Sequence, residues 1–107
     1  MKSLRNQVQL IGRLGADPEM REFSNGNNKV SISVATSDFY KNKAGEQVTD
    51  TQWHHVIAWN GTGKYIQKYM SKGTEVIVQG KLTHNSYEDK NGITRYVTEV
   101  VANQVIL

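Results

Sequence analysis

Hydrophobic and polar residues alternate along five stretches of the chain, with the period expected of strands that bury one face. In Lys29–Ser37 the alternation is clearest, with Val30, Ile32 and Val34 facing inward and polar or small residues facing outward. The other four stretches are Asn6–Leu14, Thr51–Asn60, Glu75–Leu82 and Thr94–Val105. The segment Tyr40–Thr49 is polar, with a glycine near its middle, and is predicted to be a loop.

One segment has helical spacing instead. In Lys64–Lys72, apolar residues recur at positions i, i+1, i+4 and i+5, and Gly73 follows as a natural helix stop. The residues Asp89-Lys90-Asn91-Gly92 predict a hairpin before the last strand. Three strands, a short helix and two strands are the element order of a five-stranded OB barrel, an all-β Greek-key fold, and other small barrels share that order.

Composition narrows the possible classes of protein. The 107 residues predict one domain spanning 1–107, and 13 Lys and Arg against 10 Asp and Glu give a net charge of +3, which suits a polyanionic partner. The absence of cysteine excludes a disulfide scaffold, a cysteine nucleophile and a thiolate metal site. There is no apolar run near the roughly 20 residues of a membrane span, and no signal or transit pattern at the N-terminus. We therefore expect an intracellular protein or a processed organellar one.

No group of residues has the pattern of a catalytic or metal site. His54 and His55 are adjacent, and adjacent strand residues point to opposite faces, so the two cannot easily share one metal ion. We predict a hydrogen-bonded core or interface position for His54, and neither a metal nor a cofactor for the protein. The segment Gly61–Lys64 is glycine-rich but lacks the spacing of a phosphate-binding loop.

The aromatic residues point to a different kind of chemistry. Trp53 and Trp59 lie six residues apart on one predicted strand and therefore share a face, while Tyr40 lies near Lys43 and Tyr87 precedes the hairpin. Aromatic rings interleaved with basic residues suit single-stranded nucleic acid, because rings stack on bases and cations neutralise phosphates. From the residues alone, a core position for the two tryptophans is equally consistent.

Six short motifs resemble, in order and spacing, those of bacterial-type single-stranded DNA-binding proteins. They are Asn6-x-Val8-x-Leu10-x-Gly12-x-Leu14-Gly15-x-Asp17-Pro18-Glu19-x-Arg21, Ala35-Thr36-Ser37, Trp53-His54, Tyr69-x-x-Lys72-Gly73, Val78-x-Gly80-x-Leu82 and Arg95-Tyr96-x-Thr98-Glu99-Val100. The resemblance covers nearly the whole chain. It implies a non-enzymatic OB-fold homotetramer that binds and protects single-stranded DNA in replication, recombination and repair. The implied compartment is the bacterial cytoplasm, associated with the nucleoid, and a processed organellar form stays open.

The resemblance also implies which residues bind. The stacking aromatics would be Tyr40, Trp53, Trp59 and Tyr87. The foremost phosphate contacts would be Arg21, Lys43 and Lys72, followed by Lys29, Lys64 and Lys81. His54 would lie at or near a subunit interface.

The chain departs from the bacterial pattern at its C-terminal end. Bacterial members usually continue into a flexible tail with an acidic tip that recruits replication and repair enzymes, whereas this chain has no acidic residue after Glu99. We therefore expect no tail-mediated recruitment from the chain as given. A trimmed DNA-binding core, a naturally short member and an organellar-type protein all fit this ending.

Two other functions compete with DNA coating. A protein-interaction OB module, such as a relative of primosomal replication proteins, would need less aromatic stacking surface than this sequence offers. A small nuclease or hydrolase would need a convergent set of acid and base residues, and the sequence offers none.

Overall fold

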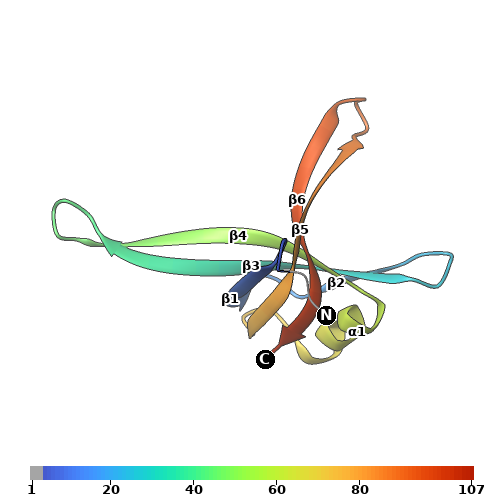
Figure 1. Ribbon diagram of the computed structural model, residues 1–107, viewed down its shortest axis with the longest axis horizontal. Coiled ribbons are helices and arrows are strands. Elements are labelled where there is room, and N and C mark those ends of the chain that lie inside the picture. The colour runs from blue at the N-terminus through green and yellow to red at the C-terminus, as the bar shows by residue number, and fades with distance from the viewer. Residues whose placement is uncertain (1–3) are drawn as a thin grey trace.

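The computed structural model describes residues 4–107, which form six strands and one helix (Figure 1). The strands are β1 (Val8–Leu14), β2 (Glu19–Glu22), β3 (Asn28–Lys41), β4 (Gln47–Trp59), β5 (Glu75–Glu88) and β6 (Thr94–Ile106), and the helix α1 (Asn60–Tyr69) lies between β4 and β5. Within residues 4–107, no helix is long and apolar enough to cross a membrane.

The sheet closes on itself. Its strand order is β1-β5-β6-β4-β3-β2, and β1 also pairs with β3 through Arg13↔Ala35 and Leu14↔Val34. That second pairing joins β1, β5, β6, β4 and β3 into a five-stranded barrel, with β2 added outside it along β3. The predicted all-β OB barrel with one short helix between its third and fourth strands is therefore confirmed.

Aliphatic side chains from alternate strand positions fill the barrel. The predicted inward-facing residues Val30, Ile32 and Val34 of β3 are buried, and Val56 and Ala58 lie opposite them on β4. These side chains belong to one cluster that also includes residues from β1, β5, β6 and α1. The alternation in the sequence thus identified the core of the barrel correctly.

Helix α1 begins and ends about one turn earlier than the predicted Lys64–Lys72. Of the predicted apolar stripe, Ile66 is fully buried in the barrel core, whereas Tyr65 and Tyr69 are 39% and 53% exposed. The first turn escaped prediction because glycine is a poor helix former. Gly63 is nevertheless required there, because a Cβ would lie 2.9 Å from a neighbouring side chain of β3.

Three hairpins project from the barrel (Figure 1), and we call their outer parts the β2–β3 arm (residues 19–29), the β3–β4 arm (residues 37–51) and the β5–β6 arm (residues 84–98). The predicted loop Tyr40–Thr49 is wrong, because β3 continues to Lys41 and β4 resumes at Gln47. Both faces of the β3–β4 arm are exposed along nearly all of its length, so the alternation that reveals a half-buried strand is absent there.

The three arms turn in the same way. In the loop Asn42–Glu46, the N–H of Asn42 donates to the carbonyl oxygen of Glu46 (3.0 Å). The N–H of Gly45 donates to the carbonyl oxygen of Asn42 (3.0 Å). The loops at residues 23–27 and 89–93 repeat both bonds. The fourth residue of each loop is a glycine with φ between 75° and 89°, a conformation that residues with a Cβ rarely adopt. The predicted Asn-Gly hairpin is confirmed at the last loop.

Candidate nucleic-acid interface

Trp53 and Trp59 lie on the outward face of β4. They are 63% and 38% exposed, so the alternative core position for the two tryptophans is wrong. The ring of Trp53 rests against Gly15, where an added Cβ would lie only 2.3 Å from a ring carbon. Gly15 therefore lets the indole lie close to the backbone, while much of the Trp53 side chain stays accessible.

Around Trp59 the structure assembles an aromatic and basic cluster. Arg21, Lys29 and Trp59 are direct cross-strand neighbours on β2, β3 and β4. The Lys29 Nζ lies 6.0 Å from the centroid of the Trp59 ring, and the Arg21 guanidinium carbon lies 5.2 Å from the centroid of the Phe23 ring. The Phe23 and Trp59 centroids are 5.9 Å apart. We call these four side chains the Trp59 cluster.

Phe23 is a member of this cluster that the sequence did not single out. It follows β2 directly and is half-buried, with its ring tilted by 32° against that of Trp59. Phe23 lies two residues after Arg21, and strand residues two apart share a face. This spacing could have indicated that Phe23 lies beside a predicted phosphate contact. The contact with Trp59 itself depends on the pairing of three strands, which no local spacing reveals.

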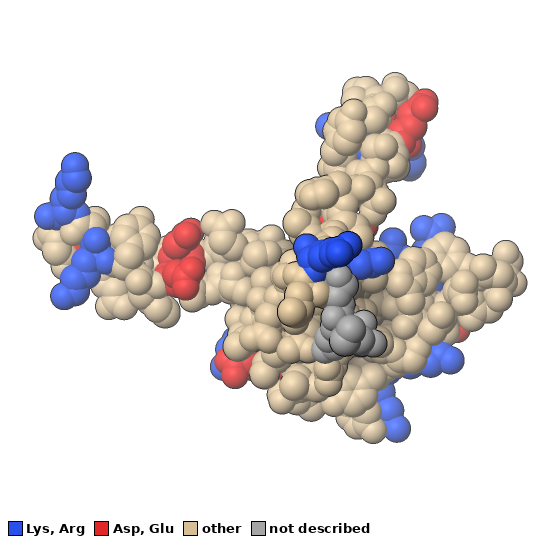
Figure 2. All heavy atoms as spheres, in the orientation of Figure 1, with Lys and Arg blue, Asp and Glu red and all other residues tan. Residues whose placement is uncertain are grey.

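The β3–β4 arm carries Tyr40 and Lys43. Tyr40 is 54% exposed, and Lys43 is exposed in the turn at the end of the arm. Figure 2 shows basic side chains at the outer end of this arm and acidic ones between that end and the barrel. Asp38 and Asp50, which face each other across the ladder, lie on this stretch. Along the arm, these two acidic residues therefore lie between the basic outer end and Trp53.

The β5–β6 arm carries Tyr87, which is 57% exposed. Its cross-strand neighbour Arg95 donates a hydrogen bond to Asp89 at 2.9 Å, and the tip of the arm is held by that contact. The N–H of Ile93 and then the Arg95 guanidinium lower the pKa of Asp89, because both stabilise its charged form. Tyr96 is 83% exposed on the same arm and is a further candidate aromatic.

The six predicted cations are distributed over several elements. Arg21 and Lys29 join the Trp59 cluster, while Lys43 lies at the end of the β3–β4 arm. The remaining three are exposed at Lys64 on α1, Lys72 after α1 and Lys81 on β5. The structure thus brings two of the predicted cations together with a predicted aromatic and spreads the other four.

The two histidines point to different partners, as the sequence predicts. His54 is half-buried, with its Nε2 2.9 Å from the hydroxyl of Thr36. His55 places its Nε2 2.9 Å from a carboxylate oxygen of Glu99, which is only 7% exposed. In the described part of the chain, no three His, Cys, Asp or Glu residues are grouped so as to hold a metal ion. The hydrogen-bonded state of His54 is confirmed, and its place at a subunit contact stays a prediction.

Known proteins match this chain over most of its length. The sequence model of the single-strand binding protein family matches residues 5–107. The single-stranded DNA-binding protein 1 of Xylella fastidiosa (strain 9a5c) is 39% identical over 101 residues, which are 94% of this chain and 74% of that protein. The single-stranded DNA-binding protein 1 of Chlorobaculum tepidum is 38% identical over 101 residues, which are 94% of this chain and 62% of that protein.

Solved structures match the whole fold. The single-strand binding protein of Plasmodium falciparum in complex with single-stranded DNA superposes with a TM-score of 0.82 at 29% identity, covering 99% of this chain and 94% of that one. A deletion mutant of the single-stranded DNA-binding protein from Thermus aquaticus gives a TM-score of 0.81 at 25% identity, covering 94% of this chain and 49% of that one.

Proposed function

The chain belongs to the single-strand binding protein family, and from this premise we propose that it binds single-stranded DNA without sequence preference. The observation that carries the proposal is the Trp59 cluster, where aromatic rings and cations are already in contact on an exposed surface. Trp53 adds a second exposed ring on the same strand face. The complex of the Plasmodium falciparum protein with single-stranded DNA supports the same partner.

The proposed mechanism divides the work between rings and cations. Bases stack on Tyr40, Trp53, Trp59 and Tyr87, and each stack is worth about 1–3 kcal/mol whatever the base, because every base has a flat π-face. Lys and Arg neutralise phosphates and release counterions, which gives affinity that falls as salt rises. A duplex conceals the base faces, so the rings favour single strands.

The proposed biological role is to coat and protect single-stranded DNA during replication, recombination and repair. The names of the bacterial relatives from Xylella fastidiosa and Chlorobaculum tepidum support single-stranded DNA as the partner. A bacterial cytoplasm is the compartment that we propose for this role. No catalytic step belongs to the proposal.

We also propose a homotetramer with His54 at or near a subunit contact. Strand β1 pairs with β3 only through Arg13 and Leu14, and Ile11 on its outer face is 56% exposed. Association would bury such apolar surface and add to the small core of a 107-residue barrel. Light scattering at micromolar concentration is expected to give the mass of four chains, and a monomer mass would overturn this part of the proposal.

Binding is tested by titrating labelled oligo(dT), and a duplex of matched length, while following fluorescence anisotropy. We expect tight binding of the single strand and far weaker binding of the duplex. Trp53→Ala and Trp59→Ala should each weaken binding by about 1–3 kcal/mol while thermal melts stay cooperative. Equal affinity for duplex and single strand would overturn the proposal, and shortening of the oligonucleotide would indicate a nuclease.

The salt dependence of the affinity distinguishes phosphate contacts made by cations from base stacking on aromatic rings. Lys43→Ala should make the slope of log K against log salt less negative by about 0.7, the contribution of one phosphate contact on a single strand. Trp53→Ala should lower affinity at every salt concentration with little change in slope. If both variants changed the slope equally, the proposed division between rings and cations would be wrong.

A further inference from the structure

The outer side of α1 carries a second set of aromatic and basic side chains. Tyr65 and Tyr69, one helical turn apart, have ring centroids 4.9 Å apart and planes tilted by 49°. The Lys68 Nζ lies 5.2 Å from the centroid of the Tyr69 ring, and Lys64 lies four residues before Lys68. Helix α1 contains no Asp or Glu, so this face is purely cationic. We call Lys64, Tyr65, Lys68 and Tyr69 the α1 face.

Packing of the barrel does not account for this face. Ile66 points into the core from α1 and is completely buried, while Tyr65 and Tyr69 are 39% and 53% exposed. The outer side of a helix that covers a core usually carries charged and polar residues. Here two large aromatic rings are placed outside beside two lysines, which is the composition that single strands require.

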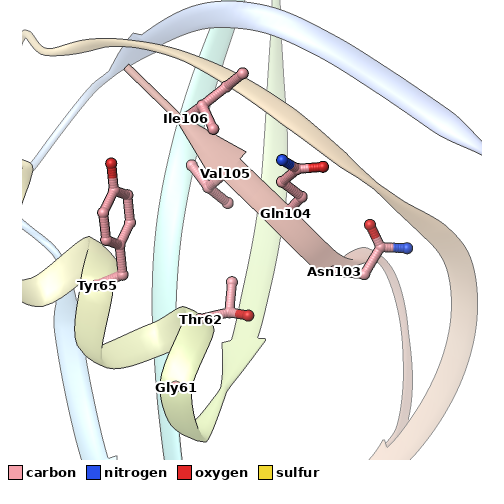
Figure 3. A pocket seen from close by; sticks show the side chains of 7 residues that line it. All are labelled: Gly61, Thr62, Tyr65, Asn103, Gln104, Val105 and Ile106. Carbon is pink, nitrogen blue, oxygen red and sulfur yellow. The ribbon is translucent and has the colours of Figure 1, made fainter.

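A pocket opens directly beside the α1 face. It lies between the start of α1 and the end of β6, has a volume of about 420 Å³, and is lined by Gly61, Thr62, Tyr65, Asn103, Gln104, Val105 and Ile106. In Figure 3, Thr62 and Tyr65 of α1 lie on one side of this space and the end of β6 lies on the other. The pocket is shallow and widely open to solvent, so a ligand there would lie against its surface. The flat ring of Tyr65 and the amide group of Asn103 suit a nucleobase.

The α1 face belongs to the helix that begins directly after Trp59. Trp59 is the N-cap residue of α1, and Tyr65 follows it by six residues, or about 9 Å along the helix axis. The axial separation between Trp59 and Tyr65 is therefore short enough for one single strand to span. The positive charge of the α1 face matches the phosphates that such a strand would bring.

We propose that the α1 face is a second stacking platform for single-stranded DNA, and this proposal rests on the proposed function. A strand that passes Trp59 continues along α1, where Tyr65 and Tyr69 offer ring faces and the two lysines contact phosphates. The pocket beside Tyr65 receives one unstacked base. The platform lengthens the bound segment and leaves the contacts at Trp53 and Trp59 as they are.

The first test compares two oligonucleotide lengths. A single OB fold covers roughly 4–16 nucleotides, so an oligo(dT) near the lower limit and one near the upper limit are titrated by anisotropy with a protein excess. Tyr65→Leu and Tyr69→Leu should each weaken binding of the longer oligonucleotide by roughly 5- to 150-fold, which is the value of one stack, and leave the shorter one unchanged. Tyr69→Phe retains the ring and should bind the longer oligonucleotide like the unchanged protein.

The second test locates the strand directly. Oligo(dT) carrying photoreactive iodouracil at successive positions is crosslinked to the unchanged protein, and the crosslinked peptides are mapped by mass spectrometry. We expect crosslinks at Tyr65 or Tyr69 from nucleotides on one side of those that crosslink to Trp59. Lys68→Glu should weaken binding of the longer oligonucleotide and reduce the salt slope, whereas Lys68→Arg should do neither.

Several outcomes would overturn the second platform. Crosslinks confined to the β4 tryptophans and the arms would do so and would leave the proposed function intact. Equal loss of short and long binding in Tyr65→Leu, together with a lowered melting temperature, would assign the tyrosines to packing. Binding of an acidic peptide at the α1 face, with no DNA crosslink there, would assign it to a protein partner. Absence of all DNA binding by the unchanged protein would overturn the proposed function itself.

Discussion

The barrel and its arms are built from the same strands but differ in how far their side chains are buried. Along β3, Val30, Ile32 and Val34 are buried, whereas Phe39 and Tyr40 are 64% and 54% exposed a few residues later. The backbone ladder to β4 runs unbroken through both regions. The two regions differ in the surroundings of their side chains, which are buried in the core along the first part of β3 and exposed to solvent in the arm. The strand pairing therefore continues beyond the region where its side chains pack into the barrel core.

This difference separates stability from binding. Burying apolar surface contributes about 25 cal/mol per Å² to folding, and nearly all of the buried aliphatic surface lies in the barrel. The arms are held by ladders and by their turns, so they are expected to open more readily than the barrel unfolds. Changes in the buried barrel core should act on folding, and changes at the exposed aromatic and basic side chains, in the arms or on the outer face of β4, should act on binding.

The largest effect is expected in the barrel. Ile66→Ala removes a completely buried side chain and leaves a cavity, so the free energy of unfolding should fall by about 2–5 kcal/mol. Urea denaturation followed by circular dichroism measures this fall. Affinity for oligo(dT), measured well below the denaturation midpoint, should change little. A loss below about 1 kcal/mol would mean that α1 is only loosely attached to the core.

An intermediate effect is expected in the β3–β4 arm. Tyr40→Ala should weaken binding of oligo(dT) by about 1–3 kcal/mol, because one stack is lost. The urea midpoint should stay unchanged, since Tyr40 is exposed and distant from the barrel core. Thr49→Ala on the same arm is the matched control and should change neither quantity. If Tyr40→Ala lowered stability as much as Ile66→Ala, the separation between barrel and arms would fail.

The smallest effect is expected at the tip of the β5–β6 arm. The pKa of Asp89 is lowered in the folded protein, so its stabilising contribution is present above the ordinary value of about 3.9 and is lost as pH falls through the lowered pKa. Acidification below pH of about 4 should therefore loosen the turn, while the barrel stays folded.

Amide chemical shifts report this loosening. The Asn91 and Ile93 N–H groups donate to Asp89 at 2.9 and 3.0 Å, so their signals should move with one shared midpoint below the ordinary pKa of an aspartate. Asp89→Asn is the control, because an amide does not titrate and the shared midpoint should vanish. Persistence of that midpoint in the control would mean that another group governs the turn.

The same contrast explains what the sequence could predict. Alternation identified the β3 core residues because one face of that strand is buried, and parity placed Trp53 and Trp59 on one shared face but left open whether that face is buried or exposed. The β3–β4 arm was not predicted because nearly all residues on both of its faces are exposed, so Tyr40 was assigned to a loop. The contact between Phe23 and Trp59 escaped for another reason, since it depends on how three strands align.

The shared turn geometry makes the arms adjustable in length. Each arm ends in a loop of five residues closed by its own hydrogen bonds and by one glycine with positive φ. Removing or adding two residues in each strand behind such a loop keeps the alternation of faces and changes the reach by about 7 Å. Evolution can therefore vary how far the arms reach from the barrel without altering a single side chain of its core.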